Sequence, residues 1–126
     1  MTIKKLVVGS MFSMLLGSEM AAADWGDVYY CQMTNFLEIT LEGEKKSYTP
    51  QKFQFKLDQT KNAMVFGSPG YFTDSVIELV TGSSFPTIEV WDANGKYSII
   101  YFEKGKFMYT QNAVGALVIS ADCDKF

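Results

Sequence analysis

The chain contains no histidine and, among its 11 basic side chains, no arginine. The lack of histidine excludes a Ser-His-Asp or Cys-His catalytic pair, an imidazole metal ligand and a side chain that switches charge near neutral pH without a perturbed pKa. The lack of arginine excludes bidentate contacts with phosphate or carboxylate groups. With 126 residues and a formal net charge of −3, the sequence indicates one globular domain rather than a multidomain enzyme or a strongly basic nucleic-acid binder.

Long hydrophobic runs are also absent, apart from one near the N-terminus. Lys4 and Lys5 precede an apolar run from Leu6 to Leu16, and Ala21-Ala22-Ala23 stands directly before Asp24. This is the pattern of a secretory signal peptide. A membrane anchor is the alternative, but an apolar helix of this length rises only about 16 Å, against a hydrocarbon core of about 30 Å. The pattern therefore favours the signal peptide.

Cleavage before Asp24 would divide the chain into a signal peptide, residues 1–23, and a single exported domain, residues 24–126. We expect this domain to be periplasmic or secreted, with no membrane insertion after cleavage. Its acids outnumber its lysines, so nucleic acids and anionic lipid surfaces are poor partners. The lysine-only basic composition, the short signal and the lack of an Asn-x-Ser/Thr acceptor indicate a bacterial origin.

Cysteine is scarce, and the two cysteines, Cys31 and Cys123, lie near the two ends of the expected domain. An even count in an exported chain indicates one structural disulfide. A metal or redox site is the alternative, but the C-x-x-C spacing is missing and no histidine can complete a tetrahedron. We therefore expect the bridge, with Cα atoms about 4.4 to 6.8 Å apart.

The expected domain shows the pattern of β-structure along its whole length. Apolar and polar residues alternate over Phe36–Leu41 and over Phe53–Asp58, which predicts strands with one solvated face. No window shows a convincing helical stripe, and the β-branched residues within Asp74–Val80 favour a strand over a short helical turn. A last strand is expected from Asn112 to Cys123.

Two turn signals predict how the later strands pair. Asn94-Gly95 separates Thr87–Asp92 from Tyr97–Glu103 and predicts a hairpin in which Gly95 has a positive φ. Lys104-Gly105 predicts a second, two-residue turn, which would pair Phe102 with Phe107 and Glu103 with Lys106. About eight short strands at roughly ten-residue spacing indicate an all-β fold, either a small antiparallel β-barrel or a β-sandwich.

Two connecting segments, Gly67–Thr73 and Thr81–Pro86, carry aromatic side chains where polar ones are expected. We favour the interpretation that these rings fold back over the core, and the alternative is a binding surface. Under that alternative the candidate ligand-binding residues are Tyr71, Phe72, Phe85 and Trp25. A related hypothesis is a stacking platform for a sugar or a peptide, although aromatic residues at strand spacing are more often part of the core. The residues concerned are Trp25, Tyr29, Tyr30, Tyr48 and Trp91.

Candidate catalytic chemistry is sparse. Glu38, Glu42 and Glu44 lie close together, but Glu42–Lys46 is typical of a solvated hairpin tip rather than of a catalytic carboxylate pair. The serines of the glycine-containing loops match no nucleophile motif. We therefore predict no catalytic residue and no cofactor.

The disulfide would bring together aspartates from both ends of the domain. A loose calcium site would be one outcome, but no EF-hand spacing is present and solvation of the carboxylates is favoured. We therefore predict no metal site. The four aspartates concerned are Asp24, Asp27, Asp122 and Asp124.

One resemblance rests on the opening Tyr29-Tyr30-Cys31, the Gly95-Lys96-Tyr97 hairpin and the closing Cys123. In topology and in the two cysteine positions, the chain resembles the small exported β-barrel inhibitors of lysozyme found in bacterial envelopes. The inhibitory loop of that family matches no stretch of this chain, so the resemblance implies no functional residue.

Together these patterns predict a non-enzymatic exported β-domain that binds a protein or a small ligand. A small hydrolase or lyase that uses carboxylates or tyrosine is one alternative, and it requires at least two carboxyl groups that converge in a pocket, one with a raised pKa. A structural subunit of an envelope or virion is another, and it requires an exposed strand edge and self-association.

Overall fold

The computed structural model describes residues 22–80 and 91–126, and every regular element in these ranges is a β-strand. The predicted all-β fold is confirmed, while the predicted segments Thr81–Pro86 and Thr87–Val90 lie outside the described residues. No helix in the described ranges is long and apolar enough to cross a membrane. In chain order the strands are β2 (Val28–Ile39), β3 (Lys45–Ser47), β4 (Lys52–Asp58), β5 (Ala63–Phe66), β6 (Val76–Glu78), β7 (Trp91–Asn94), β8 (Ser98–Glu103), β9 (Lys106–Ala113) and β10 (Gly115–Lys125).

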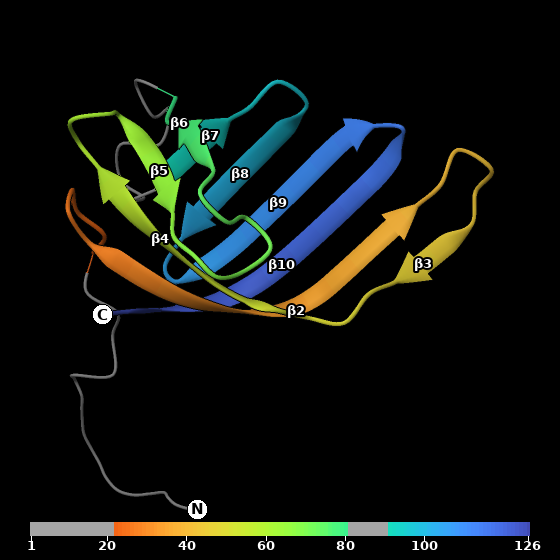
Figure 1. The fold of residues 1–126 in the computed structure, drawn as a ribbon, viewed down its shortest axis with the longest axis horizontal. Helices are drawn as coiled ribbons and strands as arrows, with labels where there is room; N and C mark the ends of the chain where they lie inside the picture. The colour runs from red at the N-terminus through yellow and green to blue at the C-terminus, as the bar shows by residue number, and fades with distance from the viewer. Residues whose placement is uncertain (1–21, 81–90) are drawn as a thin grey trace, which may run out of the picture.

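The strands form one antiparallel sheet that closes almost completely on itself (Figure 1). The strand order is β6-β5-β4-β2-β10-β9-β8-β7, and β3 pairs with the far end of β2. The two outermost strands meet at a single bridge between Leu79 and Ala93, beside which the Val80 amide donates to the Asp92 carbonyl over 2.8 Å. The fold is therefore a nearly closed eight-stranded barrel, and not a two-sheet sandwich.

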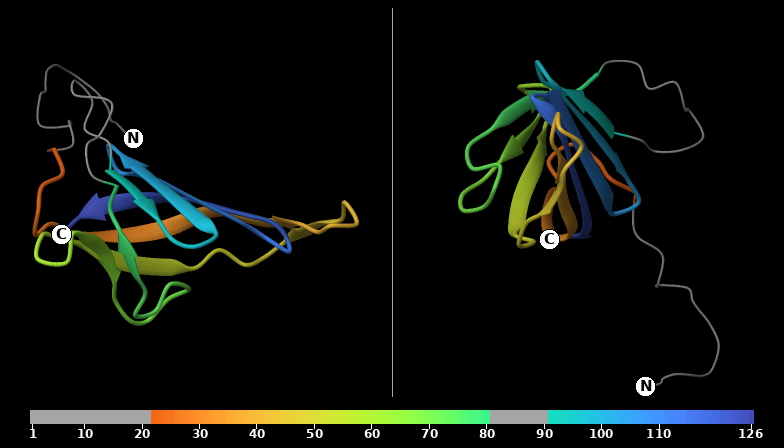
Figure 2. Two further views of the ribbon diagram at one scale, coloured as in Figure 1. Left: turned by 90° about the horizontal axis from the view of Figure 1, so that it is seen from above. Right: turned by 90° about the vertical axis from the view of Figure 1, so that its right-hand side faces the viewer.

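Two hairpins reach beyond the rest of the barrel at one end. They are the β2–β3 hairpin and the β9–β10 hairpin, and both point away from the C-terminus in Figure 1 and in the left view of Figure 2. The strand predicted over Phe36–Leu41 ends at Ile39. Of the hairpin tip predicted over Glu42–Lys46, only residues 42–44 lie in the exposed connection, because Lys45 and Lys46 belong to β3.

The predicted disulfide joins the first and last long strands of the barrel. Cys31 on β2 is the direct register partner of Cys123 on β10, and their sulfur atoms are bonded. The Cα atoms are 4.0 Å apart, closer than the predicted 4.4 Å minimum. The Cys123 amide donates to the Gly105 carbonyl on the β9 side, so the two cysteines form the closely spaced, non-hydrogen-bonded kind of antiparallel pair.

The barrel interior is filled mainly by aromatic rings from the inward-facing positions of the strands. Tyr29 stacks on Phe55, and Phe102 meets both rings edge to face, with ring centroids 4.8 to 5.5 Å apart in the three pairs. This core follows from the period-two pattern, because each buried ring alternates with an exposed or partly exposed residue along β4 and β9. The Phe53–Asp58 strand prediction is confirmed.

The two predicted turns have different outcomes. Lys104 and Gly105 have φ values of 51° and 77° and join β8 to β9 in the predicted two-residue turn, with Phe102 opposite Phe107 and Glu103 opposite Lys106. The hairpin at Asn94-Gly95 is also present, but Gly95 has no positive φ and the connection runs over residues 95–97, closed by the Gly95 amide and the Ser98 carbonyl. The predicted conformation of Gly95 is therefore wrong.

Gly105 is the turn glycine whose replacement we expect to destabilise the fold. An L side chain in the left-handed region costs about 1 to 2 kcal/mol, so Gly105→Ala should lower the free energy of unfolding by about that amount. Gly95→Ala is the matched control, because Gly95 has no positive φ and its new Cβ would meet only the side chain of Ser98. Urea unfolding measures the stability of both variants. An equal or larger loss of stability in the Gly95 variant would contradict the left-handed conformation assigned to Gly105.

Candidate functional site

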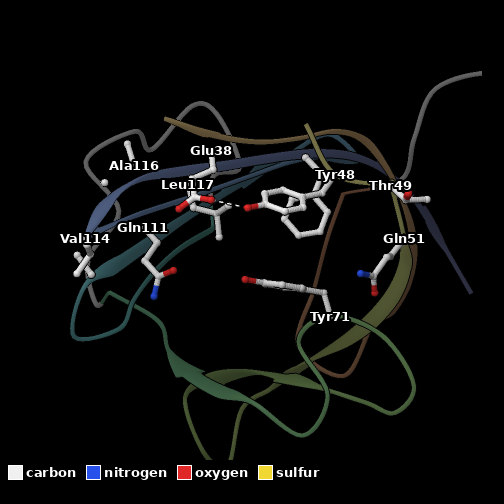
Figure 3. Close-up of a pocket in the computed structure, with 12 residues that line it drawn as sticks. Glu38, Tyr48, Thr49, Gln51, Tyr71, Gln111, Val114, Ala116 and Leu117 are labelled. Atoms are coloured by element: carbon white, nitrogen blue, oxygen red, sulfur yellow. Dashed lines mark hydrogen bonds between the residues drawn. The ribbon is translucent and has the colours of Figure 1, made fainter. Parts of the chain in front are cut away.

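The extended end of the barrel carries a pocket of about 520 Å³ (Figure 3). It lies between the β2–β3 hairpin, the β9–β10 hairpin and the loop that follows β5. Segments distant in sequence therefore supply its walls. The lining residues are Phe36, Glu38, Tyr48, Thr49, Gln51, Tyr71, Gln111, Ala113, Val114, Gly115, Ala116 and Leu117.

A β-bulge in β2 determines that Glu38 faces this pocket. Ser120 of β10 pairs with Asn35 and the next residue, Ala121, pairs with Met33, so Thr34 is an extra residue in β2. The hydroxyls of Thr34 and Ser120 lie 2.7 Å apart at the bulge. One added residue exchanges the two faces of the strand beyond it, because side chains alternate with period two.

The exchange of faces is visible in the burial of β2. Before the bulge, Cys31 and Met33 point into the core, and after it Phe36 is buried while Ile39 is 43% exposed. Simple alternation would instead place Ile39 in the interior and Glu38 in solvent. The partly buried Glu38 thus enters the pocket because of the bulge.

Tyr48 follows β3 and lies over the pocket beside Glu38. Its hydroxyl donates a hydrogen bond to Glu38 Oε1, and its ring packs against Phe36 with centroids 5.0 Å apart. The hydrogen bond to Glu38 is the largest cause of a raised Tyr48 pKa, followed by burial and by the charge of Glu38. The Tyr48 phenol is therefore a neutral hydroxyl at pH 7.

Tyr71 reaches the pocket from the loop between β5 and β6. Gly70 allows the loop to fold onto β4, since its φ is 133° and a Cβ there would lie 2.7 Å from the Lys52 carbonyl oxygen. The Tyr71 ring meets Phe36 edge to face with centroids 5.0 Å apart. Burial, and secondarily the charge of Glu38, raises the pKa of Tyr71, which also stays protonated at pH 7.

Two glutamines complete the polar lining. Figure 3 shows Gln111 of β9 on the side toward which the hydroxyl ends of Tyr48 and Tyr71 point, and Gln51 on the opposite side. Phe36 and Leu117 form apolar surface between these polar groups. With the hydroxyl of Thr49, the pocket thus offers one carboxylate, three hydroxyls and two amides over an apolar surface, an arrangement suited to holding a small polar molecule.

Comparison of the chain with protein-family models, with curated proteins and with solved structures finds no match. The pocket itself must therefore carry the functional argument.

The aromatic residues proposed from the sequence do not gather at one place. Phe72 is 5% exposed and packs edge to face against Phe53 and Tyr109, so it is part of the core. Only its neighbour Tyr71 lines the pocket. Trp25 packs edge to face against Trp91, with centroids 5.1 Å apart, and is not among the lining residues.

The remaining aromatic candidates are also dispersed. Phe85 lies outside the described residues. Of the proposed stacking platform, Tyr29 is in the core, Tyr30 packs against Phe126, and Tyr48 lines the pocket. The sequence therefore identified two of the pocket's aromatic residues, Tyr48 and Tyr71, but assigned them to separate groups.

The acidic residues are separated as well. Of the three glutamates near the β2–β3 hairpin only Glu38 lines the pocket, while Glu42 and Glu44 are exposed on the hairpin. The pocket therefore lacks, among its described lining residues, the second carboxylate that a two-carboxylate mechanism requires.

Two of the four aspartates expected near the disulfide form ion pairs with lysines. Asp27 pairs with Lys125 over 3.1 Å, and Asp122 pairs with Lys106 over 2.8 Å. Within residues 22–80 and 91–126, no three acidic or cysteine side chains are grouped so that they would hold a metal ion.

The two glutamines were missed by sequence reasoning. Neither Gln51 nor Gln111 belongs to a motif, and each is an ordinary polar residue next to or within a strand. Their role depends on which strand ends meet at the extended end of the barrel, and no local pattern contains that information.

Proposed function

We propose that this chain is an exported, non-enzymatic binding module that takes a small polar ligand in the pocket at the extended end of the barrel. One observation carries the proposal: Glu38, Tyr48, Tyr71 and the two glutamines converge on a 520 Å³ pocket with an apolar surface. Ligand sites in proteins combine concave apolar surface with a few converging polar groups. The rigid barrel supports them, since Phe36 holds both tyrosine rings.

Export is supported by two independent features. The N-terminal lysines, apolar run and Ala21-Ala22-Ala23 have the order of a secretory signal, and the Cys31–Cys123 disulfide is the bond expected of an oxidising compartment. We propose the periplasm of a bacterium, or secretion from it. Mass spectrometry of the exported protein should find Asp24 at the N-terminus. An exported protein that retains Met1 would contradict this part of the proposal.

The binding function can be tested with a matched pair of tyrosine variants. Tyr71 and Tyr101 are both 40% exposed, but Tyr71 lines the pocket and Tyr101 lies on β8, away from it. A panel of simple sugars, amines and amino acids, titrated against the isotope-labelled protein, should shift the NMR signals of the pocket residues. We expect Tyr71→Ala to weaken the binding at least tenfold and Tyr101→Ala to leave it unchanged.

The result that contradicts the binding function is equally specific. If no member of the panel shifts the pocket signals, or if both tyrosine variants bind equally well, the pocket is not a ligand site. Both variants must keep the unfolding midpoint of a folded barrel for the comparison to count, and thermal denaturation measures this.

A further inference from the structure

We propose that the ligand of this pocket is an organic cation, a small molecule that joins an ammonium group to an apolar body. The inference rests on the proposed binding function and assigns its ligand class. Its starting point is the charge of the site. Glu38 is the one charged side chain among the described residues that line the pocket, and no lysine is among them.

The Glu38 carboxylate retains capacity for a second donor. Tyr48 donates to Oε1, while an ionised carboxylate has two oxygens and about four lone-pair positions. No lysine of the described residues forms an ion pair with Glu38. An ammonium group that enters the pocket can therefore donate to the same carboxylate without displacing Tyr48.

Desolvation of Glu38 favours a cation over a neutral ligand. Glu38 is already partly buried, and a ligand that fills the pocket removes more of its water. Burying a carboxylate without a compensating charge is costly, whereas pairing it with an ammonium offsets that cost. An anionic ligand would add repulsion, because no positive side chain is among the described lining residues.

The tyrosine rings strengthen the same preference. Phe36 packs against both the Tyr48 and the Tyr71 ring, with centroids 5.0 Å apart in each pair, and Figure 3 shows the hydroxyl ends of the two tyrosines pointing to the same side of the pocket. Aromatic faces attract cations through their quadrupole, by about 0.5 to 2 kcal/mol for a cation within about 6 Å of the ring centre. Phe36 and Leu117 then contact the apolar body of the ligand. The formal net charge of −3 of the whole chain adds a long-range attraction.

Lys46 is a nearby cation that would compete with such a ligand. It lies on β3 as the register partner of Glu38, so the two side chains emerge on the same face of the sheet. Lys46 is exposed, and it is neither ion-paired to Glu38 nor among the lining residues. Removing the charge of Lys46 should therefore increase the affinity of the pocket for a cation. If Lys46 had only a structural role, its replacement would not increase this affinity.

Three probes of similar size separate the ligand classes: 2-phenylethylamine, 2-phenylethanol and phenylacetate. Calorimetric or NMR titration at pH 7 should show the amine binding about tenfold or more tighter than the alcohol, with phenylacetate weakest. Added salt should lower the affinity of the protein for the amine and leave its affinity for the alcohol unchanged. In Glu38→Gln the amide oxygen can still accept the Tyr48 hydrogen bond. This variant should bind the amine only as tightly as it binds the alcohol.

Lys46→Gln supplies the reciprocal test at an exposed position where loss of folding is not expected. This variant should bind the amine severalfold tighter than the parent protein does, and its affinity for the alcohol should be the same as that of the parent protein. If alcohol and amine bind the pocket equally well, the cation assignment is overturned while the binding function stands. If none of the three probes shifts a pocket signal but a neutral sugar of the broader panel does, the cation assignment again fails alone. Failure of every compound removes both proposals.

Discussion

Loss of the Cys31–Cys123 disulfide should lower the free energy of unfolding by about 4 to 5 kcal/mol. The two cysteines are 92 residues apart in sequence, so the bond closes most of the described domain into one loop. A closed loop of that size restricts the unfolded chain, and the chain-entropy relation gives this magnitude without any change in folded contacts. For a domain of about 100 residues, the melting temperature should fall by roughly 15 to 30 °C.

The measurement compares thermal melting of the protein with and without reductant. A Cys31→Ala/Cys123→Ala double variant serves as a second route, because reductant leaves two buried thiols in place and the variant does not. Thiol titration before and after denaturation identifies the redox state in each sample. Free thiols in the native oxidised protein, or identical melting curves, would show that the bridge does not stabilise the barrel as argued.

The position of the bridge explains why the effect should be large and not local. β2 and β10 are the two longest strands and lie side by side at the middle of the strand order. β2 begins the described sheet and β10 ends it, so their pairing requires the two ends of the domain to meet. Such distant pairing carries the highest loop-closure cost of any contact in the barrel.

The features that local sequence could predict are those that depend on a few neighbouring residues. Alternation over Phe53–Asp58 identified β4, and the glycine of Lys104-Gly105 between two apolar segments identified the two-residue turn that joins β8 to β9. Gly95 shows the limit of the same reasoning. Asn94-Gly95 can form a two-residue turn, but the paired strands select a longer connection.

The inward direction of Glu38 could not be predicted, because the bulge at Thr34 depends on β10. The extra residue is defined only by its pairing with Ser120 and Ala121, which are more than 80 residues away in the chain. Alternation alone assigned a strand to this segment, which is correct. It assigned the wrong face to the interior beyond the bulge, because Ile39 is exposed and Glu38 is partly buried.

Tyr71 and Phe72 show the same limit within two adjacent loop residues. Both are aromatic, and composition gives no reason to separate a pocket residue from a core residue. The fold of the loop onto β4 at Gly70 decides the outcome, turning Phe72 into the core and leaving Tyr71 at the pocket. The close approach of Gly70 to the Lys52 carbonyl is a contact between distant segments.

Phe55→Ala should produce the second large loss of stability, about 3 to 5 kcal/mol. Phe55 on β4 is 1% exposed, and its ring lies 5.2 Å from Phe102, 5.6 Å from Phe66 and 5.9 Å from Phe107, centroid to centroid. Truncation removes the apolar surface of a ring and leaves a cavity between strands that the disulfide and the sheet hold in place. Phe55→Leu fills part of that cavity and should cost less.

Tyr101→Ala is the matched control, since it removes an aromatic side chain from a strand of the same barrel at a position that is 40% exposed. Urea unfolding of the oxidised proteins should show a small loss for Tyr101→Ala and a large one for Phe55→Ala. Equal losses would mean that the aromatic interior does not carry the stability of the fold.

The two large effects should combine in a way that reveals how the fold is held together. The bridge acts on the unfolded chain and Phe55 on the folded core, so their contributions should add to about 7 to 10 kcal/mol. Small domains have total stabilities of only about 5 to 15 kcal/mol. Reduced Phe55→Ala should therefore lose most of the stability of such a domain, whereas the oxidised variant and the reduced parent protein each lose only one of the two contributions. Urea unfolding of all four species measures this, and a combined loss that differs from the sum of the two single losses by more than about 0.5 kcal/mol would contradict the assumed additivity.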